Sequence, residues 1–226
     1  LQSQSNLVCR LLLEKKYPDL HYLLGNALLQ SGQLHDAESS LRQALALRPT
    51  QFEALSDLGA LLLTLNRIDE AAHFLQLALG QRPDSIEVLA NLGSLKEKTG
   101  DMDGALEYYQ QALSRRLDSP DVLAKQGELL ERLGNLDEAE AAVTRGLASA
   151  PDHPLLNLVA ARLDRRNDRL AEGVARLERI LDHPMPLETR CEVHLLLGQL
   201  HDRMGNTEQV MPHLSAGKRG VDQATD

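Results

Sequence analysis

Residues 20–49 read LHYLLGNALLQSGQLHDAESSLRQALALRP and contain the pattern that decides the fold. Apolar residues recur at intervals of three and four in two runs, and Gly32 lies between the runs. The first stripe consists of Leu20, Leu24, Ala27 and Leu28, and the second of Ala37, Leu41, Ala44 and Leu45. Because side chains at this spacing share one face of an α-helix, the stretch predicts two amphipathic helices that face each other across a short turn.

The same pattern returns every 34 residues, which indicates tandem units. Four sets of positions keep this spacing: Gly25, Gly59, Gly93 and Gly127; Ala37, Ala71, Ala105 and Ala139; Leu41, Leu75, Tyr109 and Val143; and Ala44, Ala78, Ala112 and Gly146. Pro49, Pro83 and Pro151 close three units, since a proline cannot continue a helix interior. One hairpin cannot bury all of its apolar surface, so neighbouring units are expected to stack.

A 34-residue period with Leu-Gly in the first helix, Ala in the second and Pro at the junction resembles the tetratricopeptide repeat (TPR). The resemblance implies an all-α, right-handed superhelical solenoid of stacked antiparallel helix hairpins, whose first helices line a concave groove. Four regular units are expected over 18–153, and two degenerate units with a polar tail over 154–226. Residues 1–16 are interpreted as the second helix of a preceding or capping repeat.

Composition limits the classes of partner. The formal net charge is −9, from 24 Lys and Arg against 33 Asp and Glu, which argues against a nucleic-acid partner because such affinity depends on phosphate neutralisation. Apolar runs are only a few residues long, as in Leu61–Leu63, so we expect no membrane insertion. Cys9 and Cys191 are far apart, which speaks against a disulfide framework and favours a reducing, cytoplasmic location.

No catalytic signature is present in the sequence. It contains no Gly-rich phosphate loop, no nucleophile elbow and no Cys-x-x-Cys pair, so we predict no catalytic residue and no cofactor within the chain. His194 and His201 are two helical turns apart on one predicted helix, and His213 falls on the next. A metal site is one interpretation of these histidines, but packing or surface positions are the favoured one, and no metal is predicted.

The candidate binding residues follow from the groove positions that the resemblance implies. They are Tyr22, Asn26, Asp57, Asn91, Lys125, Arg162, Arg165 and Arg166. The arginines, with Arg169, share one helical face and could bind a carboxylate, a phosphate or an acidic peptide. Alternatively, they pair with Asp164, Asp168, Glu172 and neighbouring acids on a solvated face.

Two groove types known in the family can be compared with the sequence. The clamp for a chaperone's C-terminal carboxylate needs Lys and Asn in one unit, Asn in the next, and Lys and Arg in the third. Asn26 matches one of these positions, and the others are occupied by Tyr22, Asp57, Glu87 and Asn91. Without the basic residues that clamp is not expected. Only a fragment of an asparagine ladder is present, in which Asn91 and Asp57 could bond the backbone of an extended peptide.

Acidic residues also recur in register near the start of each first helix. They are Asp19, Glu53, Glu87 and Asp121. They could form an acidic line along one edge of the groove, but favourable interaction with the helix dipole is the preferred explanation.

The leading hypothesis is a non-catalytic scaffold that binds a protein or peptide segment in the concave groove. The alternative is a docking or regulatory arm of a larger enzyme, such as a sulfotransferase or glycosyltransferase, because EVHLLLGQLHDRMGNTEQVMPHLSAGKR (192–219) resembles the closing repeat of bacterial TPR-sulfotransferase proteins. Self-association through the apolar ends of the array is a third hypothesis, with Leu7 and Leu11 at one end and Val210 and Leu214 at the other.

Overall fold

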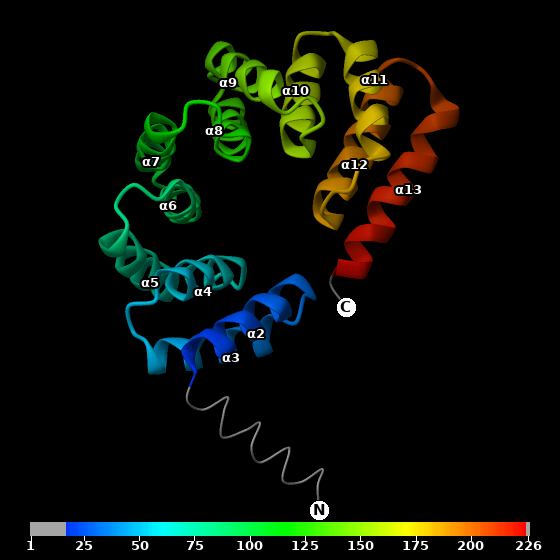
Figure 1. The fold of residues 1–226 in the computed structure, drawn as a ribbon. Coiled ribbons are helices and arrows are strands. Elements are labelled where there is room, and N and C mark those ends of the chain that lie inside the picture. The colour runs from blue at the N-terminus through cyan, green and yellow to red at the C-terminus, as the bar shows by residue number, and fades with distance from the viewer. Residues whose placement is uncertain (1–16, 225–226) are drawn as a thin grey trace, which may run out of the picture. The chain divides into compact units, whose positions relative to one another are not determined.

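The computed structural model describes the backbone of residues 17–224 and the side chains of residues 17–218. Every regular element within the described backbone is an α-helix (Figure 1). The chain divides into two compact units, residues 1–115 and 116–226, which are described separately. The predicted capping helix over 1–16, with Leu7, Cys9 and Leu11, lies outside the described residues.

The first unit contains three helical hairpins. Their helices are α2 (Pro18–Gln30), α3 (Leu34–Leu47), α4 (Phe52–Thr64), α5 (Ile68–Gln81), α6 (Ile86–Lys98) and α7 (Met102–Arg115). Within this unit the first helices α2, α4 and α6 lie on one side and the second helices α3, α5 and α7 on the other (Figure 1). The core is formed by the residues of the repeated columns, including Ala37, Leu41, Ala71, Leu75 and Ala78, all fully buried.

The second unit repeats this arrangement with α8 (Pro120–Leu133), α9 (Leu136–Ser149), α10 (Pro154–Arg166), α11 (Leu170–Leu181), α12 (Leu187–Arg203) and α13 (Thr207–Ala224). The 34-residue register shifts near Pro184, because Gly198 lies 71 residues after Gly127 instead of 68. The first helix that follows, α12, has 17 residues, against 13 in α10. Helix α13 continues to Ala224, so the described part of the expected polar tail is helical. The core of α10, α11 and α12 includes Leu158, Leu177, Val193 and Leu197.

The glycine column in the first helices has a steric cause. A Cβ atom added to Gly59 would lie 2.7 Å from Cγ of Leu75, and one added to Gly93 would lie 2.5 Å from Cε1 of Tyr109. The glycines therefore leave room for the apolar side chains of the facing helix. In the turns, Asn66 (φ 59°) and Asp168 (φ 58°) adopt the left-handed conformation that glycine provides in other units.

Three of the four repeated acidic residues contact the end of their own hairpin. Asp19 accepts from Arg48 Nη1 at 2.7 Å, Glu53 accepts from Arg82 Nη2 at 2.7 Å, and Asp121 Oδ1 lies 3.1 Å from His153 Nε2. Each contact joins the start of a first helix to the chain just after the second helix. These acids thus have partners within the protein, in addition to their position in the first helical turn.

A search of the described helices finds none that is both long and apolar enough to cross a membrane.

Candidate binding face

The predicted binding residues lie on first helices in both units. Tyr22 and Asn26 are on α2, Asp57 on α4 and Asn91 on α6, in the first unit. In the second unit, Lys125 is on α8, and Arg162, Arg165 and Arg166 are on α10. We use the term first-helix face for the side of each unit formed by these helices.

In the first unit, Tyr22, Asn26 and Asp57 form one cluster. Asn26 Nδ2 donates to Tyr22 Oη at 3.4 Å, and Gln30 Nε2 donates to Asn26 Oδ1 at 3.0 Å. Burial raises the pKa of Asp57 and the charge of Glu87 adds to the effect, whereas hydrogen bonds with Tyr22 and Asn26 oppose it. Among the described residues, Oδ2 of Asp57 is buried and has no hydrogen-bond partner.

Two further residues, Ser56 and Glu87, extend this cluster; both lie at expected groove positions on first helices but were not among the selected binding residues. Ser56 Oγ donates to Glu87 Oε1 at 3.2 Å, which places a second carboxylate near Asp57. Ser56 is 2% exposed, so its hydroxyl is fixed by packing as well as by this bond. Within the described part of the chain, no hydrogen bond joins Asn91 to the cluster.

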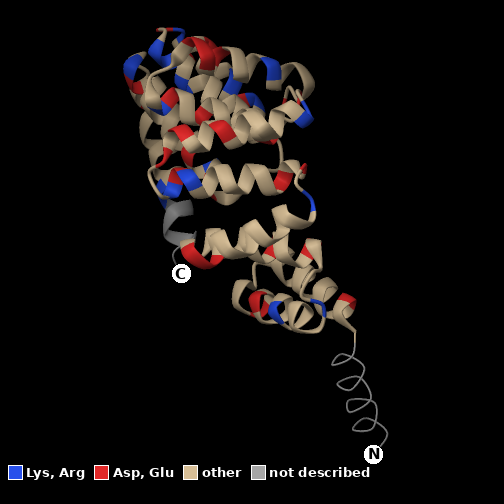
Figure 2. Ribbon diagram, turned by 90° about the vertical axis from the view of Figure 1, so that its left-hand side faces the viewer, with Lys and Arg blue, Asp and Glu red and all other residues tan. Residues whose placement is uncertain are grey.

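In the second unit, two of the three predicted arginines, Arg162 and Arg166, pair with carboxylates. Arg162 Nη1 donates to Glu128 Oε1 at 3.0 Å, and its Nη2 donates to Glu192. Arg166 Nε donates to Glu131 Oε1 at 2.6 Å. The charge on this part of the first-helix face is therefore mixed, and Figure 2 likewise shows acidic and basic residues interspersed on the helices.

The neighbouring Arg169 belongs to an internal ion-pair network. Its Nε donates to Asp164 Oδ1 at 2.9 Å and its Nη2 to Glu140 Oε1 at 3.0 Å. Arg176 of α11 reaches the other oxygen of Asp164 at 3.2 Å. Asp164 is 3% exposed, so these two arginines satisfy a buried carboxylate and connect α10 to α11.

Arg165 differs from these arginines. Among the described residues no carboxylate lies within ion-pair distance of its guanidinium, and its Nη1 instead donates to the side-chain oxygen of Gln199. Burial lowers the pKa of Arg165, Glu131 opposes this, and the positive charges of Arg166, Arg162 and Arg203 lower the pKa further. Arg165 is thus a partly buried cation in a positive environment.

A cavity of about 230 Å³ opens beside Arg165, between α10 and α12. It is lined by Arg162, Arg165, Glu192, Leu195, Leu196 and Gln199. The pKa of Glu192 is raised by burial, while the adjacent positive charge of Arg162 acts in the opposite direction. The cavity therefore combines two guanidinium groups, one carboxylate, one amide and an apolar wall.

The side chains that complete this cavity were not predicted as site residues, although one signal was present. Glu128 and Arg162 are 34 residues apart and occupy equivalent positions on successive first helices. Arg165 and Gln199 are also 34 residues apart, but the 34-residue register shifts between them, near Pro184, so their contact does not follow from the repeat. Equivalent positions on stacked repeats lie side by side. Glu192 is 30 residues from Arg162, and its position depends on the longer α12.

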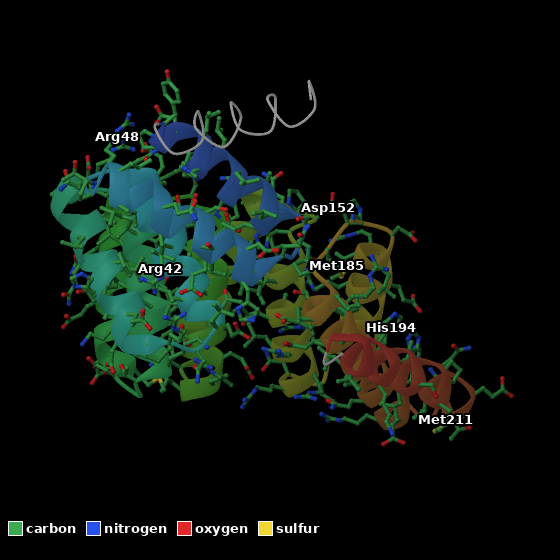
Figure 3. All side chains as sticks on the ribbon, turned by 90° about the horizontal axis from the view of Figure 1, so that it is seen from below. Arg42, Arg48, Asp152, Met185, His194 and Met211 are labelled. Carbon is green, nitrogen blue, oxygen red and sulfur yellow. The ribbon has the colours of Figure 1, made fainter. Side chains whose placement is uncertain are left out.

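Away from the first-helix face, the first unit has a second, mainly apolar cavity of about 320 Å³. It lies between α3 and α5, and its lining includes Leu45, Pro49, Phe74 and Leu77. Arg42 of α3, labelled in Figure 3, stacks 5.5 Å from the ring centre of Phe74 and pairs with Glu70 at 2.6 Å. The cation of this cavity is thus already paired, unlike Arg165.

The three histidines meet in the last hairpin. His194 Nδ1 lies 3.1 Å from His213 Nδ1, and the rings of His201 and His213 stack at 5.5 Å (Figure 3 labels His194). Burial and the neighbouring histidine lower the pKa of both His194 and His213. The described residues contain no group of three or more His, Cys, Asp or Glu side chains suited to a metal ion.

Several solved structures share the fold. PilF of Pseudomonas aeruginosa matches with a TM-score of 0.70 and 18% identity, over 87% of this chain and 88% of that chain. PilW, described as a type IV pilus biogenesis factor, matches with a TM-score of 0.71 and 19% identity, over 87% and 90%. A thermophilic TPR protein of Thermus thermophilus matches with a TM-score of 0.70 and 22% identity, over 80% and 98%.

Sequence comparison with curated proteins finds no match. Two family models, both described as tetratricopeptide repeat, match residues 28–95 and 91–154. These ranges contain the regular 34-residue columns and the hairpins from α3 to α9 that the structure shows. The chain therefore belongs to the tetratricopeptide repeat family, a family of protein-interaction scaffolds.

Proposed function

We propose that this protein is a non-catalytic scaffold that binds an extended or helical segment of a partner protein along its first-helix faces. The main support is that each face carries an ionisable, partly buried group without an ion-pair partner among the described residues. In the first unit this is Asp57, whose buried Oδ2 has no hydrogen-bond partner among the described residues. In the second unit it is Arg165, next to the cavity between α10 and α12.

Neighbouring charged residues, in contrast, do have ion-pair partners. Arg162, Arg166 and Arg169 each contact carboxylates, and Glu53 contacts Arg82. Burying a charge without a partner is unfavourable for folding, so groups of this kind are concentrated at binding sites. A partner that supplies a donor to Asp57 and an acceptor to Arg165 would satisfy both groups. Binding of this type weakens as salt screens the charges.

The proposal is tested by comparing the two sides of each unit with a photo-cross-linking amino acid. We would place it at Asn91 and Gln199 on first helices, and at the exposed positions Gln76 and Thr144 on second helices. Cross-links to the same partner from the first-helix positions alone are expected. Equal cross-linking from both sides, or cross-linking confined to Gln76 and Thr144, would refute binding on the first-helix face.

The alternative role as an arm of a larger enzyme stays a proposal that rests on the resemblance of residues 192–219. Reading the gene beyond the codon for Asp226 tests it, because a phosphate-binding loop downstream would favour a sulfotransferase and its absence would remove that argument.

Self-association also stays a proposal. Val210 and Leu214 are half-buried, and Leu214 packs toward Gly198, where an added Cβ would lie 2.7 Å from its Cδ2. Met211, which is 65% exposed, is the larger apolar side chain available to a second copy on α13. Light scattering at increasing concentration measures whether dimers form, and Met211→Lys should reduce them.

A further inference from the structure

We propose that the cavity between α10 and α12 binds a single acidic side chain of the partner, and that Arg165 binds its carboxylate through a bidentate contact. This inference rests on the proposed function and specifies the chemistry of the bound segment.

The guanidinium group of Arg165 is available for a ligand. Arg162 is held by Glu128 and Glu192, and Arg166 by Glu131. Arg165 contacts the neutral oxygen of Gln199, and no carboxylate within the described range pairs with it. An incoming carboxylate would replace this contact with a neutral amide oxygen by an ion pair, which a guanidinium can form through two parallel hydrogen bonds.

The residues that line the cavity carry a net positive charge. Two guanidinium groups and one carboxylate line the cavity, so with Glu192 ionised the lining residues alone carry a net charge of about +1, while Glu128 outside the lining also pairs with Arg162. Arg203 adds to the positive environment of Arg165, although its own Nη2 contacts Asp168 at 3.2 Å. One carboxylate would neutralise the lining. A phosphate, with a charge of about −1.5 to −2, would exceed it and lie close to Glu192.

The size and polarity of the cavity suit one side chain of a partner. A volume of about 230 Å³ is smaller than the roughly 300–1,000 Å³ of sites for small molecules and cofactors. Leu195 and Leu196 form an apolar wall beside the polar groups. This combination suits the methylene groups and terminal carboxylate of an aspartate or glutamate side chain, since the guanidinium fork matches the planar carboxylate.

Hydrogen bonds and ion pairs between helices hold the cavity in place. Arg203 Nη1 donates to the backbone oxygen of Arg165 at 3.0 Å, so α12 is tied to the end of α10 close to the cavity. On the other side, Arg162 bridges Glu128 of α8 and Glu192 of α12. These contacts position the cavity before a ligand enters, which reduces the entropy lost on binding.

The test begins with selection of short random peptides displayed on phage against the intact chain. The selected sequences are then synthesised in three forms, with their acidic residue intact, replaced by its amide, or replaced by phosphoserine. Affinities are measured for the unsubstituted chain, Arg165→Ala and Arg165→Lys. Arg145→Ala is the matched control, because it removes the same charge from an exposed position on second helix α9. Circular dichroism confirms that each variant is folded.

We expect the selected peptides to share an acidic residue next to an aliphatic one. The amide form should bind about tenfold more weakly to the unsubstituted chain, and Arg165→Ala should weaken the acidic form by about the same factor. In Arg165→Ala, the acidic and amide forms should bind equally. Arg165→Lys should restore part of the difference in affinity between the acidic and amide forms, because lysine keeps the charge but cannot form the bidentate contact. Arg145→Ala should keep the full difference.

Three results would overturn the inference. If peptides bind but Arg165→Ala does not change the ratio between acidic and amide forms, the proposed scaffold function survives and the carboxylate site does not. Tighter binding of the phosphoserine form would instead assign a phosphorylated partner. Failure to select any peptide would count against both the carboxylate site and segment binding itself.

Discussion

Arg166 and Glu131 form an ion pair at 2.6 Å in which the two side chains are very differently exposed, 44% for Arg166 and 6% for Glu131. The carboxylate is buried on α8, and the arginine reaches it from α10. Removing the arginine would therefore leave a buried acid without this partner.

We expect Arg166→Ala to lower the free energy of unfolding by about 1–3 kcal/mol, because the desolvated Glu131 loses its charge-assisted bond. The double variant Arg166→Ala/Glu131→Leu should recover much of this loss. Urea unfolding of both variants measures the difference. No loss in the single variant would show that the fold does not depend on this ion pair.

Unlike Arg166→Ala, Arg165→Gln is not expected to lower the free energy of unfolding. The substitution removes a partly buried cation that lacks an ion-pair partner in the described structure. Burial disfavours this cation, Glu131 attracts it, and three nearby arginines repel it. Stability should be unchanged or rise by a few tenths of a kcal/mol, since solvent screening limits the effect. Thermal unfolding of Arg165→Gln beside Arg166→Gln tests this. A loss for Arg165→Gln as large as that for Arg166→Gln would show that Arg165 serves the fold.

Two glycines in the first unit provide a matched test of packing. Gly59→Ala places a Cβ at 2.7 Å from Leu75 Cγ, whereas the site of a Cβ on Gly80 has nothing within 4 Å. Overpacking should make Gly59→Ala destabilising by about 1–3 kcal/mol. Gly80→Ala should stabilise by about 0.5–1 kcal/mol through helix propensity. Chemical denaturation gives both values, and equal effects would contradict a close approach at Gly59.

The last hairpin should lose stability as the pH falls. Its His194 and His213 have pKa values below the ordinary value, so the unfolded chain binds protons first and unfolding becomes easier. His213 is also near His201 and Glu178, and His194 near Arg190. Stability from these groups should be complete above about pH 7.5 and decline below about pH 6.5.

Hydrogen exchange of α12 and α13 between roughly pH 5 and pH 8, corrected for the intrinsic exchange rate, measures this local stability. The double variant His194→Gln/His213→Gln should reduce the dependence. An unchanged profile in the double variant would assign the effect to other groups.

Asp57→Asn should raise stability at neutral pH by up to about 1 kcal/mol, because burial and Glu87 disfavour the charged form. With a pKa raised in the folded state, Asp57 makes the native protein bind protons first as the pH falls. The advantage of Asp57→Asn should therefore shrink between neutral pH and about pH 4. Thermal melts across this range measure it, and a destabilised Asp57→Asn protein would mean that the ionised form supports the fold.

Much of the repeat architecture could be predicted because it depends on local geometry. Gly59 and Leu75 meet because a helix, a tight turn and a second helix bring positions 16 apart into contact. The starts of α2, α4, α6, α8 and α10, at residues 18, 52, 86, 120 and 154, keep the 34-residue period. Near Pro184 this regularity ends, and the extra turn of α12 was not predictable from the repeat columns.

The sequence by itself determined the helix hairpins, their order and which faces are apolar, because these follow from periodicities of a few residues. It also indicated which side chains could line the first-helix face. Only the tertiary structure decided which of those charges are already paired. Arg162, Arg165 and Arg166 are alike in type and lie within one helical turn, yet carboxylates on α8 and α12 pair with the first and the third. Ion pairing depends on separations of a few ångströms between long side chains of different helices, which no local pattern specifies.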